Sequence, residues 1–400
     1  MALTTVSSDR LSTNVKNTNF TAAEKQDLTD DILPLAGQLG NRNLIINGAF
    51  QVAQRGTSST SNGYYTVDRF KINDGGTDEA TTKEQVAVTS GGAYDSGFRN
   101  CLKVTNGNQT GGAGNTDYVQ IMQRIEAQNM ANSGWNYTSS SSSITLQFWV
   151  KSSVAQVFSG SLRTADGTAY QYKFDTPSLS ANTWTKVTKT IPGNSNLTFD
   201  NNNDVGLELY LFPFIGTTYT TSNSNTETWI TGAGDTYAND MTSTWWTTND
   251  ATFEITGVQL EVGSVATDFE HRSFGEELAR CQRYYEMIGF STGTGVQATV
   301  AFGMQYTTNG SFYGDIVYKQ TMRAIPTLDS NNSTGDNETF ELFSASNSNG
   351  IKFNSLDGIT GQDTRALTVY KNSVSATGGD ASYLRMEPDA GKTFGLSAEL

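Results

Sequence analysis

Residues 144–151, ITLQFWVK, alternate between apolar and mostly polar side chains. An alternation with a period of two predicts a β-strand that buries one face. The apolar face comprises Ile144, Leu146, Phe148 and Val150, and the other comprises Thr145, Gln147, Trp149 and Lys151. Residues 205–212 repeat the pattern, with Val205, Leu207, Leu209 and Leu211 opposite Glu208, Tyr210 and Phe212. A sheet with one apolar face must pack against a second layer, so these segments predict a β-sandwich.

Composition extends this prediction to most of the chain. The 400 residues include 39 Gly but only 6 Pro, and 36% are hydrophobic, enough to bury the cores of two or three domains. Abundant Thr and aromatic residues favour strands, and Gly-rich segments such as 106–116 favour loops. We therefore expect a mostly β protein, with a jelly-roll domain at 41–272, a smaller β-sandwich at 289–400, and short helices before and between them.

The segment between the two expected domains has the pattern of a helix. Ser273 and Glu276 form a Ser-x-x-Glu capping box, which marks a helix start. The apolar residues that follow fall at helical spacing: Leu278, Cys281, Tyr285 and Ile288. We expect a linker helix at 273–288 whose apolar stripe packs between domains or between subunits.

Residues 1–40 have a different pattern, without β alternation. Thr21 and Glu24 form a second capping box, and Pro34 ends the helix that it predicts. The apolar side chains near one face are Leu28, Ile32 and Leu35. A helix this short is marginal alone, so it must pack either on its own domain or, as an anchor, on another protein.

The charge of the chain limits its partners. A net charge of −14 opposes nonspecific binding to nucleic acid or to anionic membranes, so we expect neither a nucleic-acid partner nor membrane insertion. The first residues lack a basic region followed by an apolar core, so we expect no signal peptide. The two cysteines, Cys101 and Cys281, are expected to be buried small hydrophobes.

Two distant segments carry a resemblance to a known group. Residues 258–286, VQLEVGSVATDFEHRSFGEELARCQRYYE, resemble a junction in tail-fibre and appendage proteins of tailed phages, especially marine ones. Residues 43–56, NLIINGAFQVAQRG, resemble the opening of the jelly-roll module that precedes this junction. The resemblance implies a virion protein, assembled in the host cytoplasm, whose module is similar to carbohydrate-binding jelly rolls. It also implies a homotrimer whose N-terminus is anchored on a tail, portal, adaptor or capsid protein.

The sequence offers no persuasive catalytic group. His271 is the only histidine, which argues against a Ser-His-Asp triad and against a zinc site built from His and Cys. A glycosidase needs two carboxylates, but the chain has 40 Asp and Glu, so their presence does not distinguish a glycosidase from a protein without this activity. Residues 200–204, DNNND, lack the spacing of a calcium loop and are interpreted as a turn. We expect no enzyme and no cofactor; related jelly rolls often hold a structural calcium ion, for which no ligands are assigned here.

The aromatic residues are the candidates for ligand binding. Trp149 and Tyr210 lie opposite the apolar rows of their strands, so their rings would point outward, beside Gln147 and Glu208. An outward ring can stack on the apolar face of a sugar, pack against another subunit, or be covered by a loop of its own chain. Trp245 and Trp246, with Trp229 and Tyr237, form either a second sugar-binding patch or a small core that holds a loop down.

From these patterns we expect a subunit of a phage tail fibre or similar appendage, which attaches the virion to host surface glycans. A capsid or neck decoration protein, a glycan depolymerase, and a free carbohydrate-binding module are the alternatives.

Overall fold

The computed structural model describes residues 41–220, 226–232, 237–290, 298–330, 339–353, 355–386 and 393–400. Its contacts divide the chain into two units, residues 1–43 and 44–400, and the description below concerns the second. The predicted N-terminal helix and its anchoring residues Leu28, Ile32 and Leu35 lie outside the described residues. Within the described part of the chain, no helix is long and apolar enough to cross a membrane.

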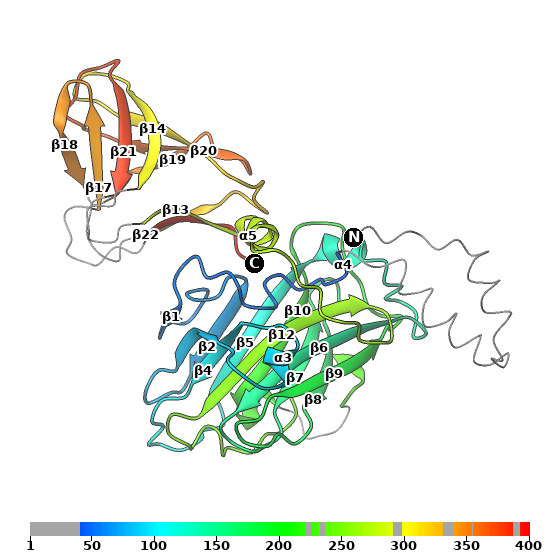
Figure 1. Ribbon diagram of the computed structural model, residues 1–400. Helices are drawn as coiled ribbons and strands as arrows, with labels where there is room; N and C mark the ends of the chain where they lie inside the picture. Colours follow the sequence, from blue (N-terminus) through cyan, green and yellow to red (C-terminus); the bar gives the residue numbers. More distant parts are fainter. Residues whose placement is uncertain are drawn as a thin grey trace, which may run out of the picture. The chain divides into compact units, whose positions relative to one another are not determined.

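Two six-stranded antiparallel sheets form the first domain (Figure 1). The first sheet has the order β1-β3-β4-β12-β6-β9. Its strands are β1 (Ser58–Ser59), β3 (Thr82–Ala87), β4 (Asn100–Thr105), β12 (Thr252–Val262), β6 (Ser143–Ser152) and β9 (Thr185–Pro192). The second has the order β11-β8-β7-β10-β5-β2. Its strands are β11 (Trp229–Thr231), β8 (Tyr170–Asp175), β7 (Ser159–Thr164), β10 (Val205–Ile215), β5 (Tyr118–Glu126) and β2 (Phe70–Gly75).

The core of this domain confirms the predicted sandwich. The apolar residues of β6 and β10 belong to one buried cluster that draws on both sheets. They include Ile144, Leu146, Phe148 and Val150 from β6, and Leu207, Leu209 and Leu211 from β10. Alternation therefore correctly identified the side of each strand that faces the core between the sheets.

Helices are short. They are α3 (Gly92–Asp95), α4 (Ala127–Ala131), the 3-10 turn η1 (Thr217–Tyr219) and α5 (Phe274–Gln282). Of these, α3 lies over the outer face of the first sheet (Figure 1). The predicted capping box is present at α5: the Ser273 hydroxyl accepts from the Glu276 N–H at 3.3 Å, and the Glu276 carboxylate accepts from the Ser273 N–H at 2.9 Å.

The predicted length of this helix was wrong, because α5 ends at Gln282 and β13 begins at Tyr285. The buried carboxylate of Glu126 accounts for the change of direction: it accepts from Arg283 Nε at 2.7 Å and from the Tyr284 hydroxyl at 2.6 Å. Tyr285 and Ile288 therefore lie on a strand. Cys281 and Tyr285 are fully buried within the single chain, and Leu278 and Ile288 are half-buried.

The second domain has its own core and two antiparallel sheets. The three-stranded sheet has the order β13-β22-β16, with β13 (Tyr285–Phe290), β22 (Thr393–Ser397) and β16 (Thr327–Ser330). The seven-stranded sheet has the order β18-β17-β21-β14-β15-β20-β19. Its strands are β18 (Asn347–Phe353), β17 (Phe340–Ser344), β21 (Ala381–Met386), β14 (Thr299–Gln305), β15 (Phe312–Val317), β20 (Ala366–Lys371) and β19 (Gly358–Thr360).

Residues that follow β22 join the two domains through buried charges. Glu399 pairs with Arg69 and, at 3.3 Å, with Arg55. The Tyr64 hydroxyl donates to the carbonyl oxygen of Leu400 at 3.0 Å. The two domains thus share a polar contact as well as the α5 connection.

Candidate functional site

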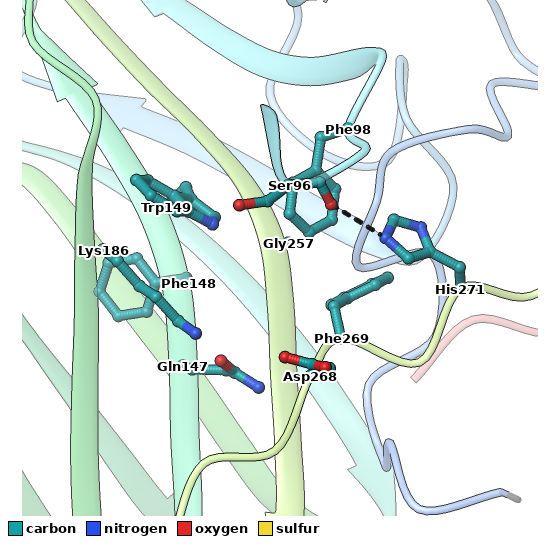
Figure 2. Close-up of a pocket in the computed structure, with 10 residues that line it drawn as sticks. All are labelled: Ser96, Phe98, Gln147, Phe148, Trp149, Lys186, Gly257, Asp268, Phe269 and His271. Atoms are coloured by element: carbon teal, nitrogen blue, oxygen red, sulfur yellow. Dashed lines mark hydrogen bonds between the residues drawn. The ribbon is translucent and has the colours of Figure 1, made fainter. Parts of the chain in front are cut away.

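A pocket of about 300 Å³ lies on the outer face of the first sheet. Its lining comes from β6, β9 and β12, from the loop after α3, and from the connector that leads to α5. The lining residues are Ser96, Phe98, Gln147, Phe148, Trp149, Lys186, Gly257, Asp268, Phe269 and His271. Figure 2 shows Trp149, Gln147 and Lys186 on one side of this pocket, with Phe269 and His271 on the other.

The floor of the pocket depends on a glycine in β12. Gly257 has a φ of 64°, a left-handed conformation that glycine adopts readily. It lies at an irregularity in the pairing with β6, between Thr256 and Gln259. A Cβ at this position would stand only 2.5 Å from the ring of Phe98. The bulge and the missing side chain together leave room above the strand.

Polar side chains of β6 and β12 form hydrogen bonds with the connector, residues 263–273, and fix its position over these strands. Gln147 Nε2 donates to the carbonyl oxygen of Thr267 at 2.6 Å. The buried carboxylate of Glu261 accepts from the Thr267 N–H at 2.9 Å and from Gln259 Nε2 at 2.9 Å. Because Gln147 is itself buried, it positions the connector rather than standing open to a ligand.

The pocket is lined mainly by aromatic rings, with two charged side chains among them. Phe98, Phe269 and His271 pack on one another with ring centroids 4.8 to 5.1 Å apart. The half-buried Trp149 ring lies against Gly92, where an added Cβ would stand 2.6 Å from the ring. Lys186 and Asp268 are exposed. Apolar ring surface with a few polar groups at its edge is suited to binding a small polar ligand such as a sugar.

The structure does not leave Tyr210 and Glu208 open, as their outward positions on β10 suggested. Tyr210 is 6% exposed and Glu208 is 3% exposed. The Tyr210 ring packs against Tyr237 of the segment after β11, at 5.6 Å, and its hydroxyl donates to Glu208 at 3.0 Å. Glu208 also pairs with Arg124 at 2.9 Å and Arg163 at 3.0 Å. A loop of the same chain therefore covers this face, and the burial of Tyr210 raises the pKa of its hydroxyl well above the ordinary value.

Trp245 and Trp246 are also unavailable as a surface patch. Both are fully buried and belong to the main core, as does Trp229. Asn106 donates to the carbonyl oxygen of Trp246 at 2.6 Å, and Trp246 Nε1 donates to the carbonyl oxygen of Gly112 at 2.6 Å. The loop is therefore held down by rings of the main core and not by a separate small core, and Tyr237 packs in a different cluster.

Of the six residues predicted to contact a sugar, only Trp149 and Gln147 line the pocket. Sequence reasoning missed Phe98, Lys186, Asp268 and Phe269, and did not place His271 in a binding site. Those five come from three segments, namely the loop after α3, β9 and the connector, and local periodicity carries no information on which segments meet. The one available signal was the aromatic pair Phe269 and His271 in a connector that otherwise has few apolar residues.

Within the described residues, no group of three or more His, Cys, Asp or Glu side chains could hold a metal ion. Cys101 and Cys281 are both buried and free, as predicted, and burial raises the pKa of both thiols.

No model of a known protein family matches the sequence, and no curated protein matches it. Several solved structures match part of the chain at low similarity. The enzymatically active domain of tailspike protein 4 from bacteriophage CBA120 is 13% identical, with 55% of this chain and 21% of that chain covered and a TM-score of 0.31. This chain therefore spans about a fifth of that domain's length.

Two carbohydrate-binding domains match similarly. The family 11 carbohydrate-binding module from Clostridium thermocellum, solved with a β-1,3-1,4-mixed-linked tetrasaccharide, is 13% identical over 53% of this chain and 98% of that chain, with a TM-score of 0.24. The N-terminal cellulose-binding domain of β-1,4-glucanase C from Cellulomonas fimi is 10% identical over 54% and 99%, with a TM-score of 0.27. At such scores these likenesses assign neither a family nor a ligand to this chain.

Proposed function

We propose that this chain is a structural subunit of a tailed-phage tail fibre or similar appendage, and that it helps attach the virion to glycans on the host surface. The virion role rests on the resemblance of residues 43–56 and 258–286 to phage appendage proteins. The anchoring of residues 1–40 on another virion protein, and a homotrimeric state, belong to the same proposal.

The observation that carries the glycan part is the pocket beside Trp149. It combines a half-buried indole ring with Phe269, His271, Lys186 and Asp268 in a volume of about 300 Å³. That volume is at the lower end of the range for ligand pockets, about 300 to 1,000 Å³, and suits a single sugar unit better than a long chain. Binding would be weak at each site and would gain strength from several copies on one particle.

The same pocket favours binding over cleavage. Asp268 is the only carboxylate among its ten lining residues, whereas most glycosidases use two carboxylates. We therefore propose that the chain binds glycans without hydrolysing them. Incubation with host polysaccharide should leave the length of the glycan chains unchanged.

The pocket is tested by glycan-array binding of the full chain and its Trp149→Ala variant. We expect the array signal to fall roughly tenfold or more, because the variant loses the main stacking surface. Asp268→Asn, a smaller change at an exposed position, should weaken binding without affecting folding. Tyr65→Ala removes a 49% exposed aromatic ring that does not line the pocket, and should bind as the parent does.

Unchanged binding by a folded Trp149→Ala variant would refute the pocket. The virion role is tested separately, by mass spectrometry of purified particles and by a cryo-EM map. A location on the capsid or neck would favour a decoration protein over a tail fibre, and absence from particles would refute both.

A further inference from the structure

The side chain of Lys186 lines the pocket beside Trp149 without a polar partner of its own. It is exposed, and its ammonium group forms no ion pair or hydrogen bond with any residue that the structure describes. By contrast, the ammonium group of Lys151, on the neighbouring β6, lies 2.8 Å from the Glu254 carboxylate and 5.0 Å from the centre of the Trp184 ring. Lys186 is therefore a cation that a ligand in the pocket can use.

Strand pairing puts this cation next to the indole ring. Trp149 of β6 and Lys186 of β9 are directly opposite each other in the antiparallel pair. Side chains opposite each other leave the same face of a sheet, with their Cβ atoms about 5 Å apart. Figure 2 shows both on the same side of the pocket. A sugar ring that stacks on Trp149 therefore has its rim beside the Lys186 ammonium group.

The position of β9 offers a simpler explanation for a lysine. This strand is at the edge of its sheet, and lysines on edge strands often only prevent pairing with another chain. Lys189 of the same strand can serve this purpose, and it pairs with Glu227 at 2.5 Å. Edge protection does not require a lysine opposite Trp149 in a pocket, so the place of Lys186 indicates a second role.

We infer that the pocket is specific for acidic glycans, and that Lys186 binds an anionic substituent on the sugar unit that stacks on Trp149. This inference rests on the glycan-binding function proposed above. A lysine is a point charge without the fork of an arginine, so the substituent is either a carboxylate or a sulfate. The contact would be a charge-assisted hydrogen bond, which is about twice as strong as a neutral one.

Asp268 sets the orientation of such a ligand. It belongs to the connector, as Phe269 does, and Figure 2 shows it near Phe269 and away from Lys186. A carboxylate accepts hydrogen bonds from sugar hydroxyl groups and repels another anion. The anionic substituent therefore points toward β9, and hydroxyl groups of the same sugar unit point toward the connector.

The net charge of −14 does not exclude an acidic ligand. At physiological ionic strength, exposed charges more than about 8 Å apart are largely screened from each other. With His271 neutral, Lys186 and Asp268 are the charged residues of the lining, and their charges balance. An anionic group beside Lys186 is therefore influenced mainly by this cation and little by distant carboxylates.

The inference is tested on a glycan array that pairs uronate oligosaccharides with their carboxyl-reduced forms, and sulfated oligosaccharides with their desulfated forms. We expect the full chain to bind an acidic form about fivefold more strongly than its neutral counterpart, and added salt to reduce this preference. Lys186→Gln should remove the preference and leave the binding of neutral forms unchanged. The pair that shows the preference identifies the anion.

Lys103→Gln is the matched control. It removes one positive charge from the outer face of the same sheet, but Lys103 pairs with Glu84 at 2.8 Å and does not line the pocket. This variant should keep the preference for acidic forms. Urea-induced unfolding checks that both variants are folded, as expected for lysines whose ammonium groups lie at the surface.

Two results would overturn the inference: equal binding of acidic and neutral forms by the parent, or a preference that persists in Lys186→Gln. If Trp149→Ala still abolishes binding in that case, the glycan-binding function stands and Lys186 only protects the edge of the sheet. A parent that binds no glycan on the array would instead refute the proposed glycan binding together with this inference.

Discussion

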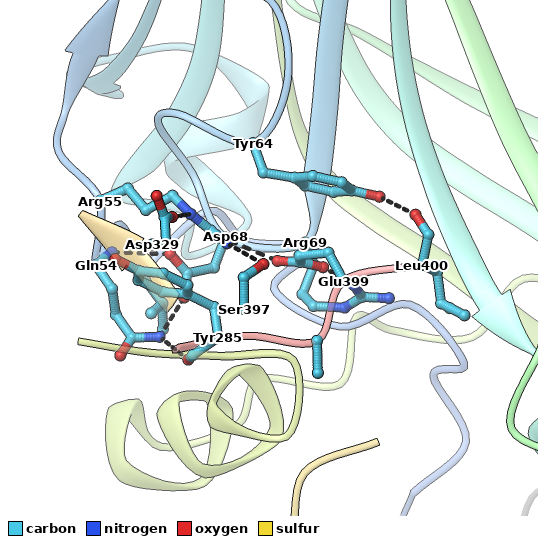
Figure 3. A network of polar contacts seen from close by, with 12 residues as sticks. Gln54, Arg55, Tyr64, Asp68, Arg69, Tyr285, Asp329, Ser397, Glu399 and Leu400 are labelled. Carbon is cyan, nitrogen blue, oxygen red and sulfur yellow. Dashed lines mark hydrogen bonds and ion pairs between the residues drawn. The ribbon is translucent and has the colours of Figure 1, made fainter. Parts of the chain in front are cut away.

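Glu399 is a carboxylate that faces two buried guanidinium groups, and its removal is an informative perturbation of the chain. Figure 3 shows Glu399 beside Arg69, with Arg55 close to Tyr285 and Ser397. The side chains of Arg55 and Glu399 are each 7% exposed, and that of Arg69 is 1% exposed. Glu399→Gln keeps the size of the side chain, removes its charge and replaces one acceptor oxygen by an NH2 donor.

The expected loss of stability is about 3 kcal/mol. Breaking a buried ion pair by removing one partner costs about 3 to 5 kcal/mol, because the other charge stays buried without compensation. Other contacts reduce the loss here. Arg55 keeps its ion pair with Asp329 at 3.4 Å and lies 3.4 Å above the Tyr285 ring. Arg69 also donates to the carbonyl oxygen of Arg124 at 2.8 Å and lies 3.3 Å above the Tyr284 ring. We therefore expect a value at the lower end of the range.

Urea-induced unfolding followed by tryptophan fluorescence measures this loss. All six tryptophans lie in the first domain, so the signal reports on the domain that contains Arg55 and Arg69. Glu227→Gln is the matched control, since Glu227 is 50% exposed in its pair with Lys189 and an exposed pair contributes at most about 1 kcal/mol. Equal losses in the two variants would show that the buried guanidinium groups do not need Glu399.

Three further predictions concern single sites. Burial raises the pKa of Asp68 from 3.8 to about 6, so the folded protein binds this proton more tightly than the unfolded chain does. The contribution of Asp68 to the free energy of unfolding should therefore fall as pH rises from about 4 to 6. In an Asp68→Asn variant, the urea midpoint should depend less on pH across that range. Gly257→Ala should lower the free energy of unfolding by about 2 kcal/mol or more, because the added Cβ meets Phe98, and should weaken glycan binding. Gly112→Ala is the control: its φ is 79° and nothing lies within 4 Å, so thermal unfolding should show only the backbone strain of about 1 kcal/mol. Ser273→Ala removes the hydroxyl that caps α5 and should cost about 1 kcal/mol in the same measurement.

Sequence patterns predicted the sandwich because aliphatic side chains fill one face of its central strands, whereas polar and aromatic side chains fill the other. In β6 and β10 the apolar residues recur at every second position, and this period alone identifies the core side. The same method is weaker in β14, TVAFGMQ, where Val300 and Ala301 are buried and Phe302 and Met304 are exposed. Apolar residues occupy both faces of that strand, so hydrophobicity could not distinguish its core side from its exposed side.

The candidate site was less predictable than the fold, because it depends on what covers each outward residue. Trp149 and Tyr210 have equivalent positions on their strands, yet one lines a pocket and the other is buried under Tyr237. The covering segments belong to loops distant in the sequence. The end of α5 depends likewise on Glu126, 157 residues before Arg283. Helical spacing alone predicted that Tyr285 and Ile288 would continue the helix.

The pairing of Arg69 with Glu399 spans 330 positions of the chain, which has a consequence for biosynthesis. At about 5 to 20 residues per second, a ribosome needs roughly 15 to 65 seconds to translate from one to the other. The strands of the first sandwich are complete at Val262, well before Glu399 exists. During translation the first domain therefore exists for a time without the Glu399 carboxylate beside Arg55 and Arg69. The ion pairs between the two domains can form only after the last strand has been translated.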